Sequence, residues 1–205
     1  MNTKFSILLN NISPFNGKMI LGITGAFGSG KTAVAAIFKK YGFEVINADK
    51  LYHGIYLKNR VLRSRIKKEF GTLDRNKIKK IVFNDHNRLK KLNEMTHPII
   101  IREIKNKIDN ILRNNKNAKI ALDVPLLIEA KMQGMADKII VVKCDEKIQI
   151  KRLLKKKKHS KREIVQITKS QMPIREKMRY ADFVVDNSGT IKETEKQINA
   201  TISLF

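Results

Sequence analysis

Cysteine, acidic residues and long apolar runs are all scarce in this sequence. Cys144 is the only cysteine among 205 residues, so no internal disulfide framework can form, which fits a protein of the reducing cytosol. We interpret Cys144 as a small buried residue that closes a strand. No apolar stretch approaches the length of a membrane span, so we expect a cytoplasmic protein without a membrane partner.

Acidic residues number 19 against 43 lysines and arginines, which gives a formal net charge of +24. Such a charge is compatible with a polyanionic partner such as nucleic acid, and also with lysine-rich solvated faces. The densest cluster, residues 151–162, contains few aromatic side chains, so it offers no platform for base stacking. Because lysines are spread through nearly every expected helix, we favour solvated faces and do not expect a nucleic-acid partner.

Five short apolar runs, each bounded by polar or turn residues, are typical of buried parallel strands. Helical patterns separate them, and this alternation predicts one α/β domain whose parallel sheet is covered by helices on both faces. With 42% hydrophobic residues the chain can bury a substantial core. The expected strands are Met19–Thr24, Phe43–Asn47, Lys119–Val124, Lys138–Lys143 and Asp182–Asp186.

The first expected strand leads into a glycine-rich loop. Residues 25–32 read GAFGSGKT and fill the pattern G-x-x-x-x-G-K-[ST]. Glycines let the backbone curl so that N–H groups point at phosphate oxygens. Lys31 places a positive charge near the β- and γ-phosphates, and Thr32 offers its hydroxyl to Mg²⁺. A helix is expected next, because apolar residues follow at helical spacing: Val34, Ile37, Phe38 and Tyr41.

Strand, loop and helix together favour a nucleoside triphosphate site over a glycine-rich turn that only caps a helix.

Three segments lie outside the α/β pattern. Residues 1–18 contain no convincing signal peptide, and we interpret them as an extension that is not part of the fold. Residues 51–116 are too long for a simple crossover, and their helical periodicity predicts an inserted, mostly helical subdomain. Residues 155–172 are basic and lack strand character, as in a lid that closes over the nucleotide of a phosphotransferase.

Ligands of open α/β sheets bind at the carboxyl ends of the strands, and two aspartates are expected there. Asp49 follows the second strand, where it is either a general base for a hydroxyl proton or the N-cap of a helix beginning near Lys50. Asp123 ends the third strand, where it either holds Mg²⁺ through a water or caps a turn.

His97 and Pro98 lie within the inserted segment, where Pro98 is expected near a helix start. A lone histidine such as His97 is more often structural than functional. Positive charge on a transferred phosphoryl group would come from the basic lid. Its candidates are Arg152, Lys155 and Lys156, among which composition does not choose.

Taken together, these motifs resemble the dephospho-coenzyme A kinase family. ITGAFGSGKT at residues 23–32 is similar to the family's strand and phosphate-binding loop (P-loop), and VINAD at residues 45–49 is similar to its Val-Ile-Asp-Ala-Asp. THPII at residues 96–100 resembles its His-Pro motif, and DVPLLIE at residues 123–129 resembles its Pro-Leu-Leu-x-Glu strand. The family's C-terminal signature resembles QMP at 171–173, Lys177, AD at 181–182 and VDNSG at 185–189.

The resemblance covers residues 19 to about 204 and implies a P-loop kinase fold. It implies that ATP, with Mg²⁺, phosphorylates the ribose 3′-hydroxyl of dephospho-coenzyme A. Residues 51–116 would bind the coenzyme, with Asp49 as the base and Lys31 as its catalytic partner. The implied ATP-binding residues are Gly25, Phe27, Gly28, Ser29, Gly30, Lys31, Thr32, Ala33 and Asn187. The implied substrate-binding residues are Thr24, Asp49, His97 and Pro125, and the implied metal-binding residues are Thr32 and Asp123.

Four positions depart from the family pattern. Asn47 stands in place of the first aspartate, which keeps hydrogen bonding but loses a charge. Ala26 replaces a usual glycine, and Phe27 is bulkier than the usual aliphatic residue. Lys156 stands where an arginine is expected in the lid, and lysine cannot clamp two phosphate oxygens in a planar fork.

Three other functions compete with this interpretation. One is a different nucleoside or nucleotide kinase with the same loop, which a panel of acceptors would separate. Another is a P-loop ATPase that binds nucleic acid, which would show a steep salt dependence. A GTP-dependent switch is disfavoured, because NKNA at residues 115–118 lacks the acid of Asn-Lys-x-Asp.

A shortened protein that starts at Met19 tests whether residues 1–18 matter to the fold. We expect it to fold and to keep its activity, because the α/β pattern begins at Met19. Circular dichroism and a kinase assay against the full chain provide the measurement. Loss of folding or of activity would refute the interpretation.

Overall fold

Residues 17–157 and 159–204 are described by a computed structural model of the chain. The expected extension, residues 1–18, lies almost entirely outside the described residues. No helix of the described part is long and apolar enough to cross a membrane.

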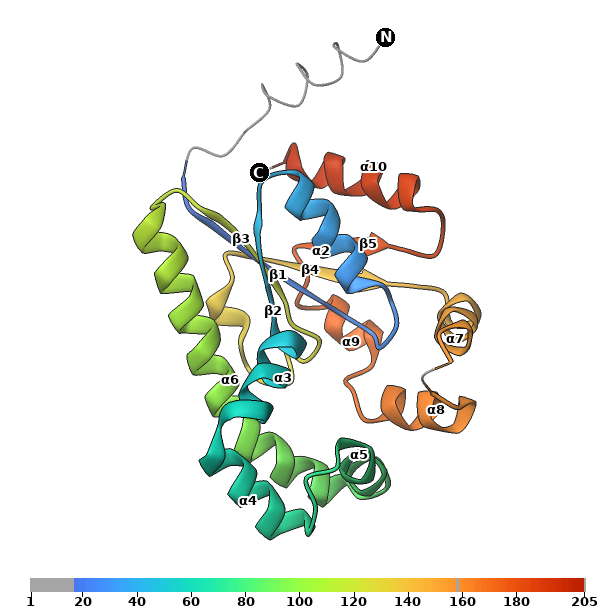
Figure 1. Ribbon diagram of the computed structural model, residues 1–205. Helices are drawn as coiled ribbons and strands as arrows, with labels where there is room; N and C mark the ends of the chain where they lie inside the picture. Colours follow the sequence, from blue (N-terminus) through green and yellow to red (C-terminus); the bar gives the residue numbers. More distant parts are fainter. Residues whose placement is uncertain (1–16, 158, 205) are drawn as a thin grey trace.

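A five-stranded parallel sheet forms the centre of the molecule, in the order β2-β3-β1-β4-β5 (Figure 1). All five expected strands are confirmed, each to within one residue at either end. They are β1 (Met19–Gly25), β2 (Glu44–Asn47), β3 (Lys119–Asp123), β4 (Lys138–Lys143) and β5 (Phe183–Asp186).

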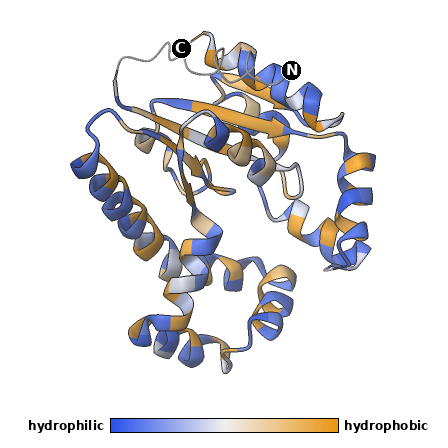
Figure 2. Ribbon diagram, turned by 45° about the horizontal axis from the view of Figure 1, so that its top comes forward, coloured by the Kyte–Doolittle hydropathy of each residue, from blue (hydrophilic) through white to orange (hydrophobic). Residues whose placement is uncertain are grey.

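Helices cover both faces of the sheet, which explains why its central strands are apolar without alternation. On one face, α2 (Lys31–Lys40) and α10 (Ile191–Ile202) pack against the sheet through a core that includes Phe38 and Ile198. On the other face the main cover is the second half of α6 (His86–Asn114), which contributes Ile104 and Ile108. The hydropathy colouring shows the strands as the most apolar part of the molecule (Figure 2).

The long segment between β2 and β3 is helical, as predicted. It contains α3 (Ala48–Lys58), α4 (Arg60–Phe70), α5 (Arg75–Asn84) and α6. A separate apolar core holds these helices together, and its buried members are Tyr56, Leu62, Ile66, Phe70, Ile78 and Val82. The first half of α6 packs on this core and its second half packs on the sheet, so one helix joins the two.

The expectation that Pro98 lies near a helix start is wrong. Pro98 lies inside α6, which begins at His86 with Asp85 as its N-cap. Proline removes one backbone hydrogen bond from a helix interior. The helix continues because apolar residues on both sides of Pro98, such as Leu92 and Ile104, are packed into the two cores.

The basic segment 155–172 contains no strand, in agreement with the prediction. It follows α7 (Glu146–Lys155) and contains α8 (Lys161–Lys169), which starts with a capping box between Ser160 and Glu163. A short helix, α9 (Ile174–Met178), then leads to β5. The Gln166 amide donates a hydrogen bond to Asn84 Oδ1 at 2.6 Å, so α8 contacts α5 of the inserted helices.

Candidate active site

The P-loop connects β1 to α2 at the carboxyl end of the sheet. Two of its glycines are required by close contacts. A Cβ on Gly25 would lie 2.1 Å from the carbonyl oxygen of Val142, and one on Gly30 would lie 2.0 Å from the side-chain nitrogen of Asn187. Both have positive φ, 151° and 93°, which favours glycine. The loop leads into the N-terminus of α2, which has no side-chain cap, and helix N-termini are sites where anions bind.

Side chains from distant elements hold the loop in shape. Asn187, next to the end of β5, donates from its amide to Ser29 O at 2.8 Å and accepts from the Thr194 hydroxyl at 2.9 Å. Gln149 of α7 is buried and donates to Phe27 O. The Phe27 ring packs edge-to-face on the His159 ring of the basic segment, with centroids 5.4 Å apart. In this structure Asn187, predicted to bind ATP, braces the loop.

The side chain of Lys31 folds back onto the backbone of the P-loop. Its ammonium donates to Ala26 O at 2.8 Å and to Gly25 O at 3.2 Å. Burial lowers the pKa of Lys31 to about 8. The positive charge of Lys177 also lowers this pKa, and the negative charge of Asp123 raises it. The Ser29 hydroxyl is buried without a hydrogen-bond partner among the described residues. The loop therefore contains a cation and an unused hydroxyl close to its amide groups.

Asp123 connects the P-loop helix to β2. The register aligns Asp123 of β3 with Ile23 of β1 and Asn47 of β2, so the three strands end at one edge. Asp123 is almost completely buried, and its Oδ2 accepts from the Thr32 hydroxyl at 3.0 Å and the Asn47 amide at 2.6 Å. The alternative that Asp123 only caps a turn is therefore wrong.

Asn47 is the N-cap of α3, and Asp49 is not. The Asn47 Oδ1 accepts from the Lys50 backbone N–H at 2.8 Å, and α3 begins at Ala48. The sequence had left Asp49 open as cap or base, with the helix expected near Lys50. The structure excludes the cap, because Asn47 already occupies that position. Asp49 lies in the first turn, where a carboxylate is favoured by the helix dipole.

The Asp49 carboxylate makes no hydrogen bond or ion pair within the described part of the chain. The carboxylate lines a pocket, where surrounding protein atoms keep part of the solvent away from it. This partial desolvation raises the pKa of Asp49, and the negative charge of Asp123 acts in the same direction. The cations Lys31, Arg75 and Lys79 oppose the rise. An unpartnered carboxylate with a raised pKa is suited to accept a proton.

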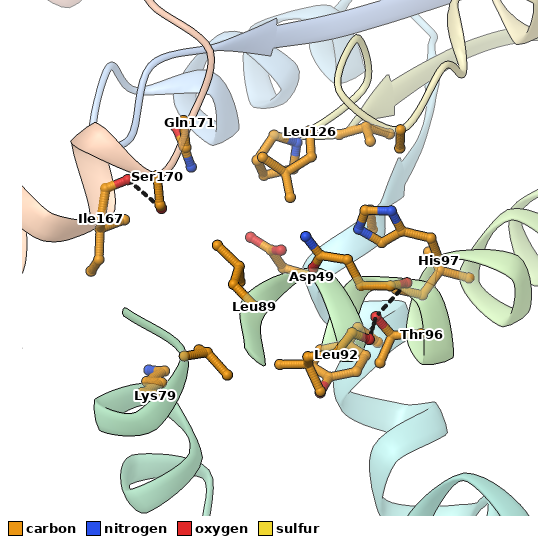
Figure 3. A pocket seen from close by; sticks show the side chains of 18 of the residues that line it. Asp49, Lys79, Leu89, Leu92, Thr96, His97, Leu126, Ile167, Ser170 and Gln171 are labelled. Atoms are coloured by element: carbon orange, nitrogen blue, oxygen red, sulfur yellow. Dashed lines mark hydrogen bonds between the residues drawn. The ribbon is translucent and has the colours of Figure 1, made fainter. Parts of the chain in front are cut away.

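A pocket with a volume of about 450 Å³ lies between the inserted helices and the basic segment (Figure 3). Asp49, His97 and Pro125 line it, together with Gln171 at the end of the basic segment. Burial lowers the pKa of His97, although Glu129 opposes the effect, so we expect a neutral imidazole at pH 7. The apolar wall includes Ile78, Val82, Leu89, Leu92, Ile100 and Ile167.

Thr24 does not line this pocket. Its side chain is completely buried, and its hydroxyl donates to Pro125 O at 3.0 Å. The same carbonyl accepts from the Lys177 ammonium at 2.9 Å. Thr24 therefore positions the strand-end loop whose Pro125 lines the pocket.

Lys177 and Glu129 form a buried ion pair that sequence reasoning did not single out. Lys177 is fully buried, and its ammonium lies 2.9 Å from Glu129 Oε1. The same oxygen accepts from the Met172 backbone N–H at 3.1 Å. This pair connects the loop after β3 to the end of the basic segment. Both residues lie within family motifs noted above, but a lysine in a polar helix gives no sign of burial.

The three lid candidates differ in their environment. Arg152 donates to the carbonyl oxygens of Asn187, Ser188 and Gly189, so its guanidinium braces the loop after β5. Lys155 and Lys156 are exposed at the end of α7.

Together the fold and the site define a kinase of the P-loop class: a phosphate-binding loop, with a carboxylate in the first turn of α3 that is open to the neighbouring pocket. Over residues 19–193 the sequence matches the family described as dephospho-CoA kinase. The chain therefore belongs to the dephospho-CoA kinase family. The family, the fold class and the enzyme class expected from the sequence are confirmed.

Relatives cover nearly the whole chain. The dephospho-CoA kinase of Carboxydothermus hydrogenoformans is 38% identical over 187 residues, which are 87% of this chain and 90% of the relative. A crystal structure from Thermus thermophilus has a TM-score of 0.75 and 28% identity, over 93% of this chain and 99% of that one. Dephospho-CoA kinase from Campylobacter jejuni has a TM-score of 0.64 and 26% identity, over 91% and 96% of the two chains.

Replacement of Lys177 by methionine tests the buried ion pair. We expect Lys177→Met to lower the free energy of unfolding by about 3–5 kcal/mol, because it leaves the Glu129 carboxylate without its cation and removes one of the two donors to Pro125 O. Lys40→Met is the control, since it breaks an exposed pair with Glu195 and should cost less than about 1 kcal/mol. Urea unfolding measures both, and equal losses would contradict this role of Lys177.

Proposed function

We propose that this chain transfers the γ-phosphoryl group of ATP to the ribose 3′-hydroxyl of dephospho-coenzyme A, which gives coenzyme A and ADP. The observation that supports this most is the Asp49 carboxylate, which is unpartnered, opens into the pocket and lies near Lys31. A hydroxyl acceptor needs such a base beside the phosphate-binding loop. Membership of the family supplies the identity of the acceptor.

The nucleotide would bind with its phosphates in the P-loop. The amides at the start of α2 and the Lys31 ammonium would hold the β- and γ-phosphates. Lys31 would then exchange its bonds to Ala26 O and Gly25 O for bonds to phosphate oxygens. Adenine would lie near the Asn187 loop.

The residues present fit a magnesium ion that arrives with ATP. Thr32 Oγ1 and Asp123 Oδ2 are hard oxygen donors 3.0 Å apart. No cluster of three or more acidic, histidine or cysteine ligands exists within the described residues, so phosphate oxygens and water would complete the coordination. When bound, the ion supplies positive charge to the β- and γ-phosphate oxygens.

The acceptor would occupy the 450 Å³ pocket, with its 3′-hydroxyl at Asp49. Asp49 would take the hydroxyl proton as the oxygen attacks phosphorus, and Lys31 would stabilise the charge that develops on the phosphoryl oxygens. Neutral His97 and the Pro125 loop would line the acceptor side. The inserted helices would hold the coenzyme, and residues 155–172 would close over both substrates as a lid, with Lys155 and Lys156 beside the phosphates.

A coupled assay for ADP release tests the function directly. Purified protein with ATP, Mg²⁺ and dephospho-coenzyme A should release ADP and produce coenzyme A. A panel of nucleosides and nucleoside monophosphates should react far more slowly. No turnover of dephospho-coenzyme A across a range of pH and metal would overturn the proposal.

Asp49→Asn tests the base. The amide preserves shape and hydrogen bonding but cannot accept the proton, so kcat should fall by about 10²–10⁴-fold while both KM values change little. Glu44→Gln, an exposed change on the adjoining strand, should leave kcat unaltered. Steady-state kinetics make the comparison. A near-normal kcat for Asp49→Asn would assign the base elsewhere.

The rate should also depend on pH through Asp49. A base works only when deprotonated, so kcat should fall as the pH drops through the raised pKa of Asp49, at a pH above that of an ordinary aspartate. A pH–rate profile measures this acid limb. It should disappear in Asp49→Asn, and its persistence there would show that another group titrates.

A further inference from the structure

Two cations of the inserted helices face the acceptor pocket, and the function proposed above gives them no role. Arg75 and Lys79 are four residues apart on α5, so they project from the same side of the helix. Both line the pocket. Both are exposed, and neither forms an ion pair with a carboxylate in the described part of the chain.

Arg75 is held in place by a histidine and two tyrosine rings. One guanidinium nitrogen, Nη1, lies 2.7 Å from His53 Nδ1. The guanidinium carbon lies 5.9 Å from the ring centre of Tyr52 and 5.8 Å from that of Tyr56, within the range of a cation–π contact. The remaining N–H groups of the Arg75 guanidinium have no partner among the described residues. They can therefore donate hydrogen bonds to the oxygens of a bound ligand.

The charges of the pocket are separated in space. Figure 3 shows Asp49 near the centre of the pocket and Lys79 at its α5 side. Apolar side chains such as Leu89 and Ile78 line the space around them. The complementary ligand therefore has a hydroxyl at one point, an anionic group some distance from it, and an apolar portion along the wall.

A phosphate group has the charge and the oxygen atoms that this pair of cations can bind. The planar guanidinium of Arg75 can bind two phosphate oxygens at once, and Lys79 adds a point charge. The P-loop is the site proposed for the triphosphate of ATP. Arg75 and Lys79 lie on α5 and do not belong to that loop. An anion bound by these two cations would therefore belong to the acceptor.

We propose that Arg75 and Lys79 bind the diphosphate bridge of the acceptor, and that this contact selects a nucleoside that carries a diphosphate ester over one that does not. The inference rests on the proposed function, since it takes the occupant of the pocket to be dephospho-coenzyme A. It assigns acceptor specificity to the inserted helices, while Asp49 and the P-loop perform the chemistry.

Arg75→Gln and Lys79→Gln test the proposal by steady-state kinetics. Each should raise KM for dephospho-coenzyme A by about tenfold or more, because a hydrogen bond to a charged group is lost. KM for ATP should stay within about twofold, since the P-loop is untouched. Arg75→Lys should recover only part of the affinity, because lysine keeps the charge and loses the fork.

Lys77→Gln is the matched control. Lys77 is exposed on the same helix and does not line the pocket, so its loss removes the same charge without the contact. The proposal predicts that KM for dephospho-coenzyme A stays near the wild-type value in this variant. It is overturned if Arg75→Gln and Lys79→Gln change that KM by no more than Lys77→Gln does.

Calorimetric binding of dephospho-coenzyme A without ATP separates this inference from the proposed function. Wild-type protein that binds the coenzyme, loses it in Arg75→Gln and yet never phosphorylates it would contradict the function and support the site. Turnover by the wild type with equal coenzyme affinity in all variants would support the function and contradict the site. Wild-type protein that does not bind the coenzyme would contradict both.

Discussion

The Asp123 carboxylate is the contact on which the geometry of the site depends. Its Oδ2 atom receives hydrogen bonds from Thr32 at the start of α2 and from Asn47 at the end of β2. Asn47 in turn caps α3, whose first turn presents Asp49 to the pocket. One buried oxygen thus fixes the distance between the phosphate-binding loop and the proposed base. In this chain Asn47 replaces the usual aspartate of the family, and its amide donates where a second carboxylate would repel Asp123.

A second set of buried contacts fixes the opposite wall. Pro125 O accepts from Thr24 and Lys177, and Glu129 joins Lys177 to the backbone of Met172. These contacts connect β1, the loop after β3 and the end of the basic segment. Breaking such a pair leaves a buried charge unpaired, so the arrangement tolerates little movement. Preorganised groups of this kind give an active site most of its electrostatic effect, because they need no reorganisation during the reaction.

Much of the fold could be predicted from the sequence, because it depends on local patterns. The strands are short apolar runs between polar residues, and the P-loop is defined by its own spacing. The site was harder to predict. Asn47 and Asp49 are both good N-cap residues two positions apart, and only the backbone distinguishes them. Pro98 continues a helix because two separate cores hold its ends, which no local rule reveals. The burial of Lys177 and the position of Arg75 depend on contacts between segments distant in sequence.

The central claim is that Asp49 holds the acceptor hydroxyl beside the P-loop. A crystal structure of the protein with dephospho-coenzyme A and a non-hydrolysable ATP analogue tests it most directly. The account predicts the ribose 3′-oxygen about 2.6–3.2 Å from an Asp49 carboxylate oxygen, with the γ-phosphate of the analogue facing it. A complex whose 3′-hydroxyl points away from Asp49, or whose coenzyme lies outside this pocket, would contradict it.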